Sequence, residues 1–75
     1  MRKVKYSELK AGMKLYNVSK DFACLTYQGL YVVRFKSPLD GYYINCQHGE
    51  HCLDCLELPD GTLSGFELVE DDISQ

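Results

Sequence analysis

One stretch of this sequence decides its fold class: Leu25-Thr26-Tyr27-Gln28-Gly29-Leu30-Tyr31-Val32-Val33-Arg34-Phe35. Its β-branched and aromatic side chains are the types that pack well on a pleated sheet. The glycine inside the stretch indicates a bulge or a tight turn. Residues 37–41 follow as a turn, because Pro38 presets φ and Gly41 accepts a positive φ. The sequence therefore predicts a strand region that leads into a hairpin.

Further strands are predicted on both sides of this hairpin. They cover residues 13–18, 42–47, 51–58 and 62–69, with turns at 48–50 and 59–61. Residues 6–12 form at most one helical turn, with Ser7 as its N-cap and Gly12 just past its end. Four or five strands joined by hairpin-length connections are typical of an antiparallel meander. We expect an all-β domain that closes into a small, partly open SH3-like barrel, with a sheet packed on one short helix as the alternative.

The expected core combines apolar residues from all of these segments. Its members are Leu9, Met13, Leu15, Phe22, Leu25, Val32, Leu56, Leu58, Phe66 and Leu68. A chain of 75 residues allows one small domain, which we place at residues 1–75. Its ends differ in charge, with a basic N-terminal arm at 1–6 and an acidic, frayed tail at 70–75.

Charge limits the classes of partner. The formal net charge is −3, and this disfavours a surface that binds duplex DNA through basic residues. The first twenty residues hold six basic side chains against one acidic, whereas the rest hold two against ten. No apolar run approaches the roughly 18 residues of a membrane span, and no signal-peptide core follows the basic start. We therefore expect a cytoplasmic protein with reduced thiols and no membrane partner.

A cluster of metal-binding residue types lies in Cys46-Gln47-His48-Gly49-Glu50-His51-Cys52-Leu53-Asp54-Cys55. Structural zinc takes four cysteine or histidine ligands in a tetrahedron. The set Cys46, His48, Cys52 and Cys55 meets that count; His51 could replace His48, or Cys24 could supply the fourth ligand. Against this set, Cys52 and Cys55 would point to opposite faces of an extended strand.

The preferred interpretation of the cysteines is therefore buried or idle thiols and no cofactor. Bound zinc is the second interpretation, and redox chemistry is the third. A nucleophilic cysteine needs a base within reach and a third group that orients the base. Neighbouring residues on a strand face opposite ways, and so small a domain leaves little room for a substrate pocket. We therefore expect no enzymatic activity.

The tyrosines are the second notable feature. Tyr27, Tyr31, Tyr42 and Tyr43 flank the turn at Pro38. They serve either as cross-strand packing pairs or as an exposed surface for a protein partner, since tyrosine is enriched at interfaces. Our first hypothesis is a non-enzymatic accessory or regulatory module that binds another protein through these tyrosines and an acidic surface. The alternative is a zinc-stabilised domain that contacts single-stranded nucleic acid through basic residues, namely Arg2, Lys3, Lys5, Arg34 and Lys36. The oligomeric state stays open.

Overall fold

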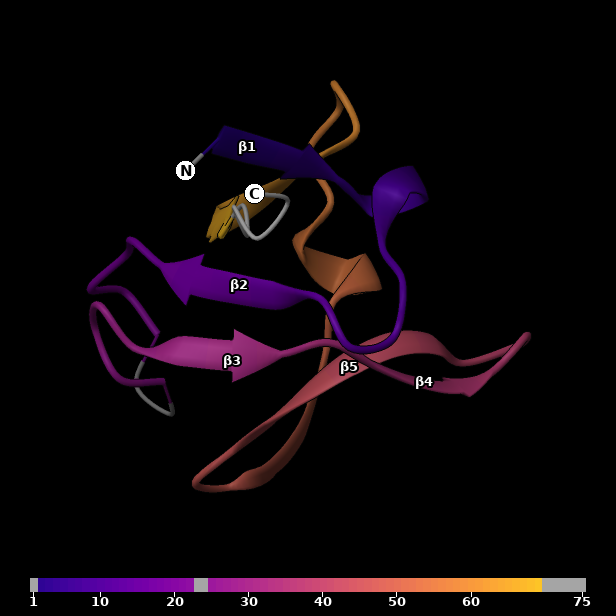
Figure 1. Cartoon of the computed structure of the whole chain (residues 1–75), viewed down its shortest axis with the longest axis horizontal. Helices are drawn as coiled ribbons and strands as arrows, with labels where there is room; N and C mark the ends of the chain where they lie inside the picture. Colours follow the sequence, from indigo (N-terminus) through magenta and orange to yellow (C-terminus); the bar gives the residue numbers. More distant parts are fainter. Residues whose placement is uncertain (1, 23–24, 70–75) are drawn as a thin grey trace, which may run out of the picture.

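The computed structural model describes residues 2–22 and 25–69. These residues form seven strands in two antiparallel sheets, together with two short 3-10 helices (Figure 1). The elements, in chain order, are β1 (Arg2–Lys5), η1 (Tyr6–Glu8), β2 (Lys14–Asn17), β3 (Leu30–Val32), β4 (Arg34–Ser37), β5 (Gly41–Cys46), β6 (Gly49–Cys52), η2 (Asp54–Leu56) and β7 (Thr62–Leu68). The all-β class is thus confirmed. No helix within the described ranges is long and apolar enough to cross a membrane.

The larger sheet has the strand order β1-β7-β2-β3. Its centre joins the two ends of the domain, because β7 pairs with β1 through Lys3 and Glu67 and with β2 through Leu15 and Leu68. The basic arm expected at residues 1–6 contains β1, which the sequence analysis did not recognise as a strand. A lysine-rich strand is typical of a sheet edge, where charged side chains deter pairing with other chains.

The smaller sheet has the order β4-β5-β6 and consists of two consecutive hairpins. The predicted turn at 37–41 is present: Ser37 Oγ accepts a hydrogen bond from the Asp40 amide at 3.0 Å, and Gly41 has a φ of 77°. The predicted strand at 42–47 is β5, displaced by one residue. Local turn chemistry thus positioned this part of the chain.

The two sheets are linked at Val33, the single residue between β3 and β4. Its amide donates to the Met13 carbonyl at 2.8 Å, and its carbonyl accepts from the Gly12 amide at 2.8 Å. The strand therefore changes partners here, from β2 in the larger sheet to β5 in the smaller one. Figure 1 shows β3 and β4 as one bent path from the first sheet to the second.

The core lies between the two sheets. Its buried apolar members are Val4, Leu9, Leu15, Leu25, Val33, Ile44, Leu53, Leu63, Phe66 and Leu68. Half of these were predicted, whereas Val4, Val33, Ile44, Leu53 and Leu63 were missed. Val32 and Leu58 were wrongly placed in the core, since their exposed fractions are 47% and 38%. Val32 fails because Val33, one residue later, takes the inward position on the same strand.

The predicted strand at 51–58 is also wrong in its second half. β6 ends at Cys52, and Leu53 has a helical backbone with φ −88° and ψ −22°. Leu53 is fully buried, and its amide donates to the Tyr42 carbonyl at 3.1 Å. This anchored leucine turns the chain into η2, and the strand character returns only at the bridge between Glu57 and Leu63.

Candidate functional site

Two of the four predicted tyrosines pack inward. The Tyr31 ring meets Phe66 edge-on at 6.2 Å between centroids, and its hydroxyl accepts a hydrogen bond from the Thr26 amide at 2.6 Å. The Tyr42 ring meets Tyr6 edge-on at 5.9 Å, and the Tyr42 amide donates to the Tyr6 hydroxyl at 3.1 Å. Both tyrosines are half-buried, so packing accounts for their main contacts.

The other two tyrosines lie outside the core but apart from each other. Tyr27, in the turn before β3, is 43% exposed, and the Lys20 ammonium sits 5.0 Å from its ring centroid. Tyr43 lies on β5 directly opposite Arg34 of β4, on the face of the smaller sheet that also carries Cys52. The structure therefore does not gather the four tyrosines into one surface.

An apolar patch replaces the expected tyrosine surface, and Tyr43 is part of it. The patch consists of Leu30, Val32, Phe35 and Tyr43, and the last three line one pocket. Phe35 approaches this pocket from the face opposite to Tyr43, because it pairs with Tyr42, whose ring lies 5.2 Å from its own. The first three members of the patch have exposed fractions of 60%, 47% and 48%. Leu30 and Val32 lie two residues apart on β3 and so share its outer face. Sequence reasoning missed Leu30 and Phe35, although the alternation of Leu30 and Val32 with Tyr31 and Val33 carries the signal.

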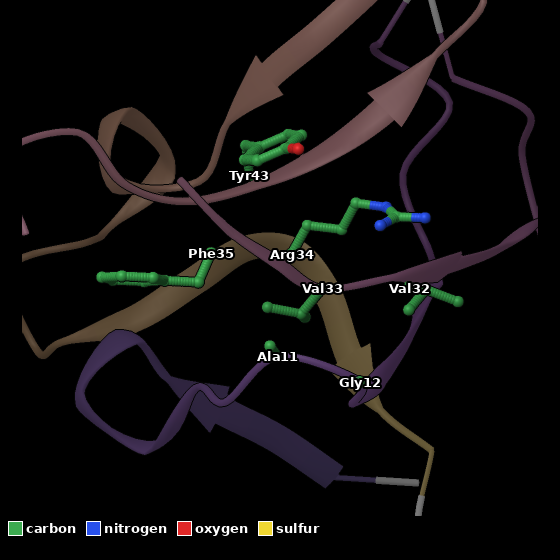
Figure 2. A pocket seen from close by; sticks show the side chains of 7 residues that line it. All are labelled: Ala11, Gly12, Val32, Val33, Arg34, Phe35 and Tyr43. Atoms are coloured by element: carbon green, nitrogen blue, oxygen red, sulfur yellow. The ribbon is translucent and has the colours of Figure 1, made fainter. Parts of the chain in front are cut away.

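A shallow pocket of about 300 Å³ lies at one end of this patch. It opens where the strand bends between the two sheets. Its lining consists of Ala11, Gly12, Val32, Val33, Arg34, Phe35 and Tyr43 (Figure 2). In this view Ala11 and Gly12 lie on one side and Tyr43 on the other, with Val33 between them. The Phe35 and Arg34 side chains extend in opposite directions along the pocket.

Two cations border the patch without a partner. Lys14 lies directly across from Val32 in the register of β2 and β3, and Arg34 follows two residues after Val32. Within the described residues, neither side chain makes a hydrogen bond or an ion pair. In contrast, Lys36 Nζ lies 2.7 Å from Glu50 Oε1, and this hydrogen bond raises the pKa of Lys36 above its usual value.

The basic residues proposed for nucleic acid do not share one surface. Arg2, Lys3 and Lys5 lie on β1 at the edge of the larger sheet, whereas Arg34 and Lys36 lie on β4 at the edge of the smaller one. Arg2 also pairs with Glu8 at 3.2 Å. Hydrogen bonding from the Lys5 amide, and then from Arg2, lowers the pKa of that carboxyl.

Acidic side chains gather in the connection between β6 and β7. Asp54, Glu57 and Asp60 are all exposed there. Asp60 Oδ1 accepts hydrogen bonds from the hydroxyl and the amide of Thr62, at 2.6 and 2.9 Å, which lowers the pKa of Asp60. These contacts hold the turn before β7, so at least one carboxylate of the acidic surface has a structural role. The acidic tail predicted at 70–75 lies outside the described residues.

The predicted zinc ligands are separated by the hairpin of β5 and β6. Cys52 pairs with Tyr43, and Cys46, three residues beyond Tyr43, therefore points to the opposite face of the sheet. His48 is exposed in the turn, and Cys55 donates its thiol hydrogen to the Cys52 carbonyl at 3.2 Å. No group of three or more metal-binding side chains comes together among the described residues.

His51 and Cys24 are the alternative zinc ligands that the sequence suggests. His51 lies on the inner face of β6, where its ring meets Phe22 edge-on at 6.0 Å. Cys24, the alternative fourth ligand, lies outside the described residues. The zinc site stays a prediction, and native mass spectrometry before and after chelation is its test.

Comparison of the chain with protein-family models, with curated proteins and with solved structures found no match.

Proposed function

We propose that this protein is a non-enzymatic accessory or regulatory module that binds another protein through its apolar patch. The hypothesis of binding through tyrosines is retained in part, because Tyr43 belongs to this patch and Tyr27, Tyr31 and Tyr42 do not. The acidic side chains around η2 form a separate, polar surface.

The observation that carries the proposal is the exposure of large apolar side chains along the outer face of β3 and around the pocket beside it. Leu30, Val32 and Phe35 are each about half exposed or more, and Val32, Phe35 and Tyr43 line one pocket. Scattered apolar side chains are normal on a protein surface, whereas contiguous ones mark interaction sites. Aromatic residues and arginine are enriched at protein interfaces, and Phe35, Tyr43 and Arg34 line this pocket.

The proposal includes a finer description of the fold, a partly open SH3-like barrel. Three features support it: a strand that bends from one sheet into the other at Val33, two consecutive hairpins after that bend, and a 3-10 turn before the last strand. A cytoplasmic location belongs to the same proposal. The free thiols of Cys46, Cys52 and Cys55 suit a reducing compartment.

The test compares proteins captured from an extract by the wild-type chain and by two variants. Leu30→Ser with Val32→Ser removes the outer face of β3, whereas Leu39→Ser removes an apolar side chain that is 92% exposed in the turn between β4 and β5. We expect a partner that binds the wild type and Leu39→Ser at equal levels and is lost from the double variant. Identical captured proteins for all three chains would refute the proposal.

A further inference from the structure

We infer that the partner segment bound by this patch carries an apolar side chain flanked by carboxylates. The apolar side chain enters the pocket beside Val32 and Phe35, and a carboxylate pairs with Arg34. This inference rests on the proposed function and specifies the chemistry of the partner.

The size of the pocket favours a single side chain as its occupant. At about 300 Å³ it lies at the lower limit of the volumes that hold small-molecule ligands. It is also shallow, and much of its lining is apolar, from Val32, Val33 and Phe35. One leucine-sized or phenylalanine-sized group presented by an extended segment suits such a shape better than a free small molecule, which needs enclosure on most sides.

The charge around the pocket indicates which residues flank the apolar side chain of the partner segment. Arg34 lines the pocket, Lys14 lies across from Val32, and neither side chain has a partner within the described residues. In contrast, Arg2 is paired with Glu8 and Lys36 with Glu50. The patch is therefore positive within a chain whose net charge is −3. A guanidinium beside an apolar surface binds a carboxylate with charge-assisted, often paired, hydrogen bonds.

Nucleic acid is the competing class of anionic partner, and the surface fits it less well. Binding of single strands relies on aromatic rings on which successive bases stack. The two aromatic members of the patch, Phe35 and Tyr43, belong to opposite faces of the smaller sheet, so they do not form a continuous stacking platform. Leu30 and Val32, along β3, are aliphatic. Of the other basic residues of the nucleic-acid hypothesis, Lys36 is paired with Glu50. Arg2, Lys3 and Lys5 lie on β1, at the edge of the other sheet.

The test is a titration of the ¹⁵N-labelled chain with three synthetic peptides, followed by amide NMR spectra. The peptides have a central leucine flanked by aspartates, the same leucine flanked by lysines, and a central serine flanked by aspartates. We expect the first to shift the amides of Val32, Arg34 and Tyr43 and to bind about tenfold more tightly than the other two.

Two variants of the protein distinguish a specific ion pair between Arg34 and the peptide from a general effect of positive charge. Arg34→Gln should weaken binding of the aspartate–leucine peptide about tenfold. Lys36→Gln removes the same unit of charge two residues along β4 and should change binding less than about twofold, because its ammonium is held by Glu50. The spectra of both variants in the absence of peptide verify that the fold is retained.

Several outcomes would overturn the inference. They are equal affinity for all three peptides, shifts confined to another surface, equal losses for both variants, or no binding up to the solubility of the peptides. Tighter binding of a thymidine oligonucleotide at Arg34 and Lys14 would also overturn it, in favour of nucleic acid. Capture from the extract distinguishes the two proposals. If a partner is still lost from the Leu30→Ser, Val32→Ser variant, the proposed function stands, and only the inference that the partner segment carries carboxylates is refuted.

Discussion

Val32 and Val33 are neighbours in the sequence but belong to opposite sides of one bent strand. Val33 is 1% exposed and packs in the core, and both of its backbone groups bond to residues 12 and 13. Val32 is 47% exposed and borders a pocket with Leu30 and Arg34 on either side along the strand. The inner side is therefore constrained by the fold, while the outer side is available for a partner.

This comparison separates stability from function within a single strand. Side chains on the inner side of β3 and β4 should govern the free energy of unfolding. Side chains on the outer side should govern binding and leave stability nearly unchanged. Variants placed on the two sides therefore test the assignment directly.

The largest effect should come from a charge placed on the inner side. Val33→Asp buries a carboxylate without a partner and should cost about 3 kcal/mol or more of unfolding free energy. Val32→Asp leaves its carboxylate in water and should cost less than about 1 kcal/mol. Urea unfolding followed by circular dichroism measures both. Similar losses for the two variants would mean that the strand faces are assigned incorrectly.

A smaller loss of unfolding free energy is expected at Gly65, where an added side chain would crowd the Phe22 ring. Gly65 on β7 has a φ of 82°, and a Cβ there would lie 2.5 Å from the Phe22 ring. Gly65→Ala should therefore cost about 2 kcal/mol, from the left-handed backbone and the displaced ring together. Gly49→Ala is the matched control, because Gly49 has a φ of 113° with open space around it. It should cost only about 1 kcal/mol. Equal costs in urea unfolding would show that the Phe22 ring moves freely.

Tyr31 and Tyr43 differ in whether the hydroxyl group makes a hydrogen bond within the described residues. Tyr31→Phe removes the acceptor of the Thr26 amide and should lower the unfolding free energy by about 0.5 to 1 kcal/mol. Tyr43→Phe removes a hydroxyl that makes no hydrogen bond within the described residues, so thermal unfolding should show almost no change. A larger loss for Tyr43→Phe than for Tyr31→Phe would reverse the assignment of these residues to packing and to surface.

The smallest effect concerns the ion pair on the outer side. Because Glu50 raises the pKa of Lys36 above 10.5, the stabilisation is complete below 10.5 and disappears as pH rises through the raised value. Both side chains are exposed, so the contribution is small and screened by salt. The difference in urea midpoint between wild type and Lys36→Gln should shrink from neutral to strongly alkaline pH. A constant difference would show that the pair does not stabilise the fold.

Local signals in the sequence were sufficient for the hairpins and for the class of fold. The pair of Pro38 and Gly41 fixed a turn, and the segments on either side became β4, which contains Phe35, and β5, which contains Tyr42 and Tyr43. Residues 62–69 became β7, the strand that joins both ends of the domain, with a difference of one residue. Such elements depend on turn chemistry and on β-forming side chains, which act over a few residues.

Long-range pairing decided what local signals missed. Residues 2–5 form β1 because β7, far along the chain, supplies their hydrogen bonds. Leu53 interrupts the predicted strand at 51–58 because the core accepts its side chain and Tyr42 accepts its amide hydrogen. That interruption also changes the relative placement of two predicted zinc ligands, because Cys52 ends a strand while Cys55 lies in a 3-10 turn.

Composition and turn residues were enough to predict a small all-β protein with hairpins at defined turns. The sequence also shows that apolar and aromatic residues concentrate between residues 25 and 46. Which side of each strand is buried, however, depends on the pairing of strands in the folded chain. Side chains alternate with a period of two, so a shift of one residue exchanges core for surface, and only pairing with other strands fixes that register. The exposed patch at Leu30 and Val32 is a consequence of that choice.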